Sequence, residues 1–140
     1  MSTEDNKTLV QRFFEEVINQ RNVAALDQFI SPNGVNHTVP HGMPQEPGQF
    51  LSLYLNAFPD VKATVEDVLA DGDKVMVRVS YRGTHHGAFR GIPPTGRQIT
   101  VTGLNIFRIT NGKLAEHWGL ADRLSVLQQL GVVPPLGPAS

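Results

Sequence analysis

Histidines and carboxylates are the side chains of this sequence that could do chemistry, because it contains five histidines, thirteen Asp and Glu residues and no cysteine. Without cysteine there is no disulfide, thiolate metal site or thiol nucleophile. The histidines are poorly spaced for a metal ion. His85 and His86 are adjacent and would point apart in a strand, and His37 and His41 lie in a stretch rich in Gly and Pro. The spacing therefore predicts no metal site and favours proton transfer.

Asp122 is a carboxylate at the end of an apolar segment, directly before a predicted helix. It could cap that helix through its side chain. It could also act as an acid and base at carbon, for which burial would have to raise its pKa. An apolar mouth that could bury it is available from Phe14, Phe58, Phe107 and Trp118. The residues alone leave both uses of Asp122 open.

Three further polar side chains are candidates for a site. His37 follows the second predicted helix, where it could relay protons or polarise a substrate carbonyl, or be an ordinary loop histidine. Asn105 interrupts an apolar strand face, so its amide could donate to an enolate oxygen or make a structural hydrogen bond. Tyr54 lies on a helical apolar stripe, which predicts a core position with the hydroxyl at a polar edge that a ligand could reach.

His117 and Trp118 are neighbours on a predicted strand, so their side chains point to opposite faces of the sheet. Counting alternate residues groups Trp118 with Leu114 and Leu120, which predicts that Trp118 faces inward. His117 is then expected on the outer face or at a dimer contact. Glu116 also falls on the inner face in this count. A β-bulge in the strand would shift the alternation by one residue.

An Asp–Arg–Asp arrangement for epoxide hydrolysis could be assembled from Asp67, Arg78 and Asp122. Arg78 has the wrong strand parity for the apolar face of residues 75–81, so this reaction is not expected. We instead expect Arg78 and Arg82 on a solvated face or at a dimer contact.

Composition and charge exclude several classes of protein. The 140 residues are 40% hydrophobic and 18% charged, as in ordinary globular domains. Twelve Lys and Arg against thirteen Asp and Glu give a net charge of -1 without a basic run, so nucleic acid is not an expected partner. The N-terminus is polar and acidic, and no apolar stretch approaches the length of a membrane span, which predicts a cytoplasmic protein without a membrane partner. The chain also lacks the glycine-rich nucleotide-binding motifs.

Helical spacing dominates the first sixty residues. Apolar residues at 9–18 predict a helix, with a possible capping box from Ser2 and Asp5 at its start. A short second helix is predicted over residues 22–29, and a third over residues 50–58 before Pro59. The stretch between the second and third helices is predicted to be a loop with a short strand at residues 35–38.

Strand-like alternation follows, then a short helix. Four strands are predicted, at residues 61–71, 74–81, 98–110 and 113–121. Leucines every three residues then predict a closing helix at residues 124–130. Helices followed by an antiparallel meander indicate an α+β fold with the helices on one face of the sheet. We expect a single domain over residues 1–131 and an extended, Pro-rich tail over residues 132–140.

Several motifs in order along the chain resemble those of one known family. They are AFPD at 57–60, GTHHG at 83–87, GIPPTGR at 91–97, FR at 107–108, NGK at 111–113 and EHW at 116–118. Together they look like the SnoaL-like polyketide cyclases, and the likeness covers nearly the whole chain.

The resemblance implies a cone-shaped α+β barrel of the nuclear transport factor two type, in which three N-terminal helices and a strongly curved, mainly antiparallel sheet enclose a blind apolar pocket. It also implies a homodimer. In characterised cyclases of this family a pocket aspartate acts as acid and base in an intramolecular aldol condensation without a metal or cofactor. By its place after the EHW motif, that aspartate matches Asp122, and the family often has a pocket histidine where His37 stands.

The sequence therefore predicts a cofactor-free cyclase or isomerase acting on a hydrophobic carbonyl compound. Its predicted catalytic residues are Asp122 and His37, and its predicted substrate-binding residues are Asn105, Trp118, Phe14, Tyr54, Phe58 and Phe107. The alternative is a non-catalytic binder of small molecules with the same fold, which a solvent-facing, helix-capping Asp122 would favour.

Overall fold

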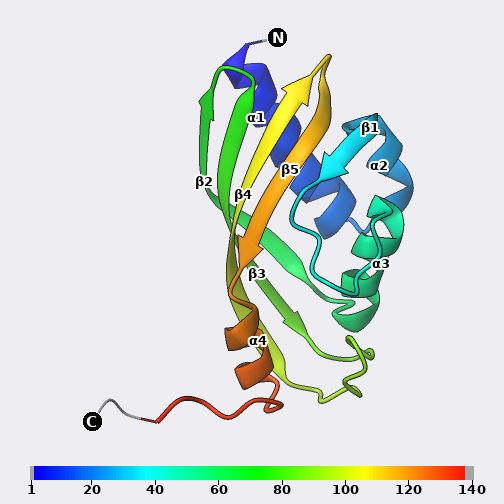
Figure 1. The fold of residues 1–140 in the computed structure, drawn as a ribbon, viewed down its shortest axis with the longest axis vertical. Helices are drawn as coiled ribbons and strands as arrows, with labels where there is room; N and C mark the ends of the chain where they lie inside the picture. The colour runs from blue at the N-terminus through cyan, green and yellow to red at the C-terminus, as the bar shows by residue number, and fades with distance from the viewer. Residues whose placement is uncertain (1, 138–140) are drawn as a thin grey trace.

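The helices of the first sixty residues lie along one side of a single long sheet (Figure 1). The computed structural model describes residues 2–137. α1 spans Thr3–Arg12 and continues without a break as a π-helical segment, Phe13–Asn19. A 3₁₀ turn at Val23–Ala25 leads into α2, Leu26–Phe29, and α3 spans Pro47–Ala57.

Five strands form one sheet in the order β1-β5-β4-β3-β2. Their bounds are Ile30–Asn36 for β1, Lys62–Asp71 for β2, Lys74–Thr84 for β3, Gln98–Thr110 for β4 and Lys113–Ala121 for β5. β1 is parallel to β5, and the other three pairs are antiparallel. A last helix, α4, spans Arg123–Gln129. The predicted α+β fold with a curved, mainly antiparallel sheet is confirmed, and so are three helical regions before it.

Local sequence signals set the ends of these elements. The predicted capping box is present, since Ser2 Oγ accepts a hydrogen bond from the Asp5 amide and the Asp5 carboxylate accepts one from the Ser2 amide. Asn111 and Gly112 both have positive φ, 52° and 72°, as the two-residue turn between β4 and β5 requires.

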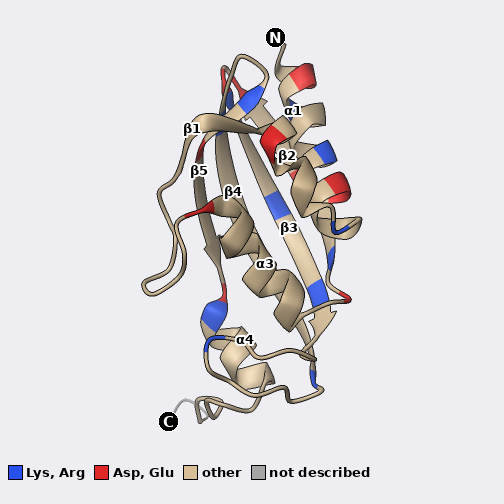
Figure 2. Ribbon diagram, turned by 90° about the vertical axis from the view of Figure 1, so that its right-hand side faces the viewer, with Lys and Arg blue, Asp and Glu red and all other residues tan. Residues whose placement is uncertain are grey.

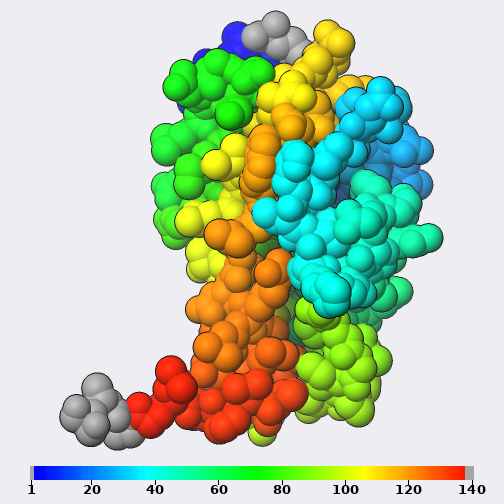
Figure 3. Space-filling model, in the orientation of Figure 1, coloured from blue at the N-terminus to red at the C-terminus, as the bar shows by residue number. Residues whose placement is uncertain are grey.

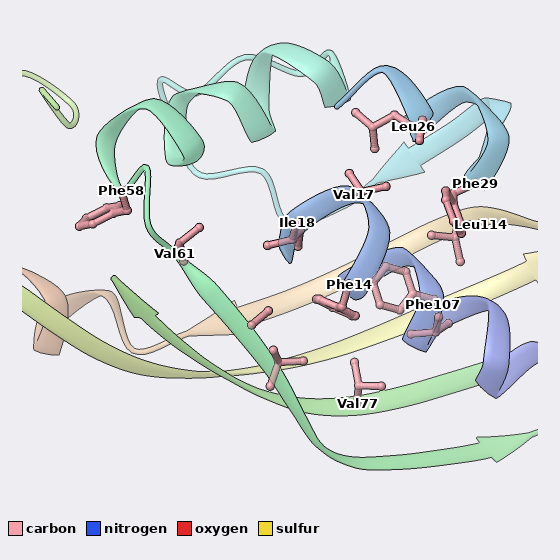
Figure 4. Close-up of a cluster of buried hydrophobic side chains, with 14 of the residues drawn as sticks. Phe14, Val17, Ile18, Leu26, Phe29, Phe58, Val61, Val77, Phe107 and Leu114 are labelled. Atoms are coloured by element: carbon pink, nitrogen blue, oxygen red, sulfur yellow. The ribbon is translucent and has the colours of Figure 1, made fainter. Parts of the chain in front are cut away.

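The core lies between the helices and the inner face of the sheet (Figure 4). The alternation predicted for β3 is present: Val75, Val77 and Val79 are fully buried, while Lys74, Met76 and Arg78 are exposed. The helical side contributes Phe14, Val17, Ile18, Leu26 and Phe29 to the same core. Figure 2 shows charged residues along the outer side of α1, away from this core.

β1 differs from the sequence-based expectation. A short strand was predicted at residues 35–38, but β1 begins at Ile30 and runs through Pro32. Proline lacks an amide proton, yet it is tolerated here because β1 is an edge strand with one neighbour. The short second helix predicted over residues 22–29 is present as a 3₁₀ turn followed by the four residues of α2.

A β-bulge in β5 corrects the predicted orientation of His117 and Trp118. Ile109 pairs with Leu114 but Arg108 pairs with Glu116, so one residue of β5 is extra. Beyond the bulge His117 pairs with Phe107 on the inner face, and Trp118 pairs with Ile106 on the outer face. The parity count was therefore wrong after the bulge, and Trp118 faces outward.

The chain after α4 forms no helix or strand over residues 132–137. The remainder of the predicted tail, residues 138–140, lies outside the described residues. Among residues 2–137, none of the helices is both long enough and apolar enough to cross a membrane.

Candidate active site

A cavity of about 630 Å³ lies between the inner face of the sheet and the helices. Its walls come from the π-helical segment, α3, α4, the strands β1, β3, β4 and β5, and the loop between β3 and β4. Five of the predicted substrate-binding residues line it: Phe14, Tyr54, Phe58, Asn105 and Phe107. In the space-filling view, the loop after β1 (cyan) lies between β5 (orange) and α3, above the loop between β3 and β4 (yellow-green) (Figure 3).

His117 and Asn105 form a polar pair on the wall of this cavity. His117 Nε2 lies 2.8 Å from Asn105 Oδ1, and both residues line the cavity. β4 and β5 are antiparallel neighbours, and Asn105 pairs with Gly119, two residues after His117. The two inward side chains are therefore diagonal neighbours on one face of the sheet.

The imidazole of His117 is neutral at pH 7. Burial lowers its pKa from the ordinary 6.5 to about 4. Its ring stacks on that of Phe107 with a centroid separation of 4.6 Å and an interplanar angle of 10°. Because Asn105 Oδ1 can only accept a hydrogen bond, Nε2 carries the proton of the neutral ring. Nδ1 has no hydrogen-bond partner among residues 2–137 and holds a free lone pair.

The amide nitrogen of Asn105 is a buried donor. Asn105 is 8% exposed, and its Nδ2 has no hydrogen-bond partner among the described residues. Buried donors without a partner are uncommon, and because Asn105 lines the cavity, this donor is available to a ligand there. Tyr81 also lines the cavity, and burial raises the pKa of its hydroxyl to about 12, an effect that the neighbouring Asn105 partly offsets. The hydroxyl is therefore protonated at neutral pH.

Gly119 makes the room that this polar pair occupies. A Cβ atom at Gly119 would lie 2.6 Å from Asn105 Oδ1 and 2.9 Å from His117 Nε2. Its amide donates a 2.7 Å hydrogen bond to Thr38 Oγ1, which fixes β5 to the segment after β1. The His117–Asn105 pair can therefore form only because residue 119 has no side chain.

Asp122, the predicted acid and base, caps α4. Its Oδ1 accepts a hydrogen bond from the Ser125 amide at 3.0 Å, and the residue is exposed and absent from the cavity lining. Asp122 therefore caps the helix in the structure, which was the alternative to a pocket acid and base. A catalytic role for Asp122 stays a prediction.

His37 and Trp118 lie together on the outside of the sheet, which corrects their expected place in the pocket. Their rings stack at 4.8 Å, and His37 Nε2 is 2.9 Å from Glu116 Oε1. Glu116 also bonds Arg108, and these two contacts lower the pKa of its carboxyl, the one to Arg108 most. The outward turn of Glu116 at the bulge draws His37 to this face and away from the cavity.

The other chemical candidates lie apart from the cavity. Arg78 pairs with Asp67 at 2.7 Å, and both side chains are exposed, so the epoxide-hydrolase arrangement is not assembled. His85 is fully buried and accepts a hydrogen bond from the Thr95 amide. Among residues 2–137, no group of three or more His, Asp or Glu side chains could hold a metal ion.

His117 is the site residue that the sequence analysis missed. A signal was present in the strand pattern, because Leu114 and Glu116 cannot both face an apolar core without burying a charge. A one-residue bulge between them resolves that conflict and turns His117 inward.

Comparison with known proteins identifies the family and agrees with the fold. The model of the SnoaL-like polyketide cyclase family matches residues 8–130. The chain belongs to this family. Nogalonic acid methyl ester cyclase of Streptomyces nogalater is 31% identical over 111 residues, which cover 76% of this chain and 83% of that protein. An aklanonic acid methyl ester cyclase of Streptomyces peucetius, DnrD, is 26% identical over 106 residues, 74% of this chain and 72% of that one.

Solved structures of this cyclase family's fold superpose over almost the whole chain. AclR of Streptomyces galilaeus, described as a candidate hydroxylase, gives a TM-score of 0.86 at 26% identity, covering 97% of this chain and 87% of AclR. IdmH of Streptomyces antibioticus, described as a candidate polyketide cyclase, gives a TM-score of 0.75 at 33% identity, covering 91% of this chain and 99% of IdmH.

Proposed function

We propose that this SnoaL-like protein is a cyclase that closes a ring in a hydrophobic carbonyl compound by an intramolecular aldol reaction without a cofactor. The observation that carries the proposal is the His117–Asn105 pair on the wall of a mostly apolar cavity. The cyclase relatives support the reaction class. The pair supplies a proton acceptor, His117 Nδ1, and a hydrogen-bond donor for a substrate oxygen, Asn105 Nδ2.

The proposed reaction starts with transfer of a proton from the carbon next to a carbonyl to Nδ1 of His117. The C–H electron pair moves into the enolate, whose oxygen accepts a hydrogen bond from Asn105 Nδ2. The enolate carbon then attacks a second carbonyl of the same molecule and forms the new C–C bond. The resulting alkoxide takes the proton back from the imidazolium, so the step needs no oxidant, reductant or co-substrate.

The electrostatics of the cavity suit this sequence of charges. Burial keeps His117 neutral, so its lone pair is available at any pH well above 4. The imidazolium that forms is stabilised by the negative enolate beside it and by its Nε2–H bond to Asn105, which becomes charge-assisted. The buried Asn105 donor is already in place, which reduces reorganisation during the reaction.

Asp122 is retained as the second candidate for the acid and base, on the family match alone. The experiment that separates the two candidates compares His117→Gln with Asp122→Asn. The test substrates are the two compounds for which the relatives are named, nogalonic acid methyl ester and aklanonic acid methyl ester. If His117 is the base, its variant loses about 10²- to 10⁴-fold in turnover while binding is retained. Loss of turnover in Asp122→Asn alone would assign the role to Asp122.

A non-catalytic binder of the same fold is the alternative to a cyclase. The capping geometry of Asp122 is the observation that favours it. Exchange of the substrate's α-proton in deuterated water separates the two, because a cyclase of the proposed mechanism exchanges it even when ring closure is slow. Binding without exchange or ring closure would favour the binder.

We also propose that the protein is a homodimer through the outer face of its sheet. This face carries large exposed apolar side chains, namely Leu69, Met76, Leu104, Ile106 and Leu120. They extend across four neighbouring strands, since Leu69 pairs with Met76, Met76 with Ile106, and Leu104 with Leu120. An apolar sheet face of this extent is typical of a surface that a partner covers, and a second copy offers the same face.

A further inference from the structure

Tyr81 lies on the cavity wall beside the His117–Asn105 pair. It is on the inner face of β3, in line with the buried Val77 and Val79, and it packs against the core. From this position we infer that Tyr81 is a second hydrogen-bond donor of the reaction, which binds the oxygen of the carbonyl that the enolate attacks. The inference rests on the proposed function and adds a catalytic residue to it.

The strand register puts Tyr81 and His117 on opposite sides of Asn105. Tyr81 pairs with Val101 of β4, so Gly103 is its diagonal neighbour and Asn105 lies one inner-face position further along β4. His117 reaches Asn105 from β5, on the other side of β4. The three side chains therefore come from three adjacent strands, in the order Tyr81, Asn105, His117.

Gly103 leaves the space that the ring of Tyr81 occupies. A Cβ atom at Gly103 would lie 3.2 Å from Cε2 of Tyr81, which is closer than side chains normally pack. The ring therefore extends across Gly103 in the direction of Asn105. Gly119 makes the corresponding space for His117 on the β5 side. A glycine on each side of Asn105 thus lets an aromatic ring approach it.

The hydroxyl of Tyr81 keeps its proton and can donate it in a hydrogen bond. Burial raises its pKa to about 12, and Asn105 partly offsets this rise, as a neighbouring hydrogen-bond donor does. The side-chain amide of Asn105 therefore lies beside the oxygen of the hydroxyl. No group of residues 2–137 accepts the proton of this hydroxyl, which leaves it available to a ligand in the cavity.

An aldol reaction has two oxygens that need a donor. Negative charge develops first on the enolate oxygen and then on the oxygen of the second carbonyl, as the new C–C bond forms. Asn105 is in contact with His117, so its Nδ2 serves the enolate oxygen that the first proton transfer creates. Tyr81, on the side of Asn105 away from His117, serves the second oxygen. It stabilises the alkoxide by a hydrogen bond and keeps its own proton, so the balance of the reaction is unchanged.

Tyr81→Phe removes this hydroxyl and keeps the ring that lies over Gly103. Ring closure and exchange of the α-proton in deuterated water would be measured by NMR on nogalonic acid methyl ester and aklanonic acid methyl ester, for the wild type, Tyr81→Phe and His117→Gln. Ser80→Ala, which removes a hydroxyl from the outer face of β3, is the matched control. We expect Tyr81→Phe to close the ring about 10²- to 10³-fold more slowly, the effect of one lost oxyanion donor, with KM unchanged within about threefold.

The two steps of the reaction separate the roles of the two side chains. Tyr81→Phe should exchange the α-proton at the wild-type rate or faster, because an enolate that attacks slowly returns to substrate, whereas His117→Gln should lose exchange and ring closure together. Wild-type rates of both steps in Tyr81→Phe, or equal loss of both, would overturn the inference and leave the proposed function standing. Absence of both exchange and ring closure in the wild type would contradict the proposed function and the inference with it.

Discussion

His117 and Asn105 meet across the β4–β5 pair, with Nε2 of the histidine 2.8 Å from Oδ1 of the asparagine. A single extra residue in β5 is responsible for this contact, because the bulge turns His117 to the inner face and Trp118 to the outer one. The same bulge turns Glu116 outward, where it bonds Arg108 and His37. One backbone irregularity thus turns the polar pair toward the cavity and the Glu116 carboxylate toward Arg108 and His37.

The stability of the protein should fall in mild acid because of His117. Its pKa is about 4 in the folded protein and 6.5 in the unfolded chain, so between these values only the unfolded chain binds the proton. The free energy of unfolding contributed by this group is therefore complete above pH 6.5 and decreases by about 3 kcal/mol as the pH falls to 4.

Urea unfolding at pH 7 and pH 4.5 checks this prediction. Replacing His117 with Gln removes the titrating group, so the variant should lose less stability than the wild type between the two pH values. His86→Gln, at an exposed histidine, is the control and should behave as the wild type does. Identical pH dependence in the wild type and His117→Gln would show that this imidazole is not buried in its neutral form.

Replacement of Gly119 by Ala should disrupt the polar pair. The added methyl would lie 2.6 Å from Asn105 Oδ1 and 2.9 Å from His117 Nε2, so one of the two side chains must move. We expect a loss of about 1–3 kcal/mol of stability and of most of the turnover. Gly137→Ala, where a Cβ would meet nothing within 4 Å, should change neither. Full activity in Gly119→Ala would show that turnover does not need the contact between His117 and Asn105.

The cap on α4 can be tested apart from catalysis. Asp122→Ala should lower stability by about 1 kcal/mol, whereas Asp122→Asn should keep most of it because asparagine caps equally well. Thermal unfolding of the two variants measures this difference. Equal stability of both variants and the wild type would remove the capping role.

The proposed dimer predicts a specific response to a charge on the outer face. Ile106→Lys places an ammonium group at the centre of the exposed apolar side chains, between Met76 and Trp118 on the neighbouring strands. Sedimentation at micromolar concentration should show a dimer for the wild type and a monomer for this variant. A wild type that sediments as a monomer would contradict the proposal.

The sequence predicted the fold well where a signal is local. The Asn111-Gly112 turn, the Ser2–Asp5 capping box and the alternation of Val75, Val77 and Val79 each follow from neighbouring residues and are all present. The parallel pairing of β1 with β5 was not predicted, because it joins segments about eighty residues apart that carry no local signature.

The site was predicted less completely than the fold. Asn105 was placed on the inner face correctly, since β4 alternates without interruption from Ile99 to Ile109. His117 and Trp118 were each predicted on the wrong face of the sheet, because the alternation of side chains along a strand is shifted after a bulge. His37 was expected in the cavity on family likeness, and only the structure shows that Glu116 binds it on the outer face.

Turnover of the two test substrates by wild-type protein and His117→Gln, measured side by side at pH 7, tests the central claim most directly. The account predicts ring closure by the wild type and a rate at least about 100-fold lower for the variant, with substrate binding unchanged within about threefold. Equal rates in the wild type and His117→Gln would contradict the assignment of His117 as the base.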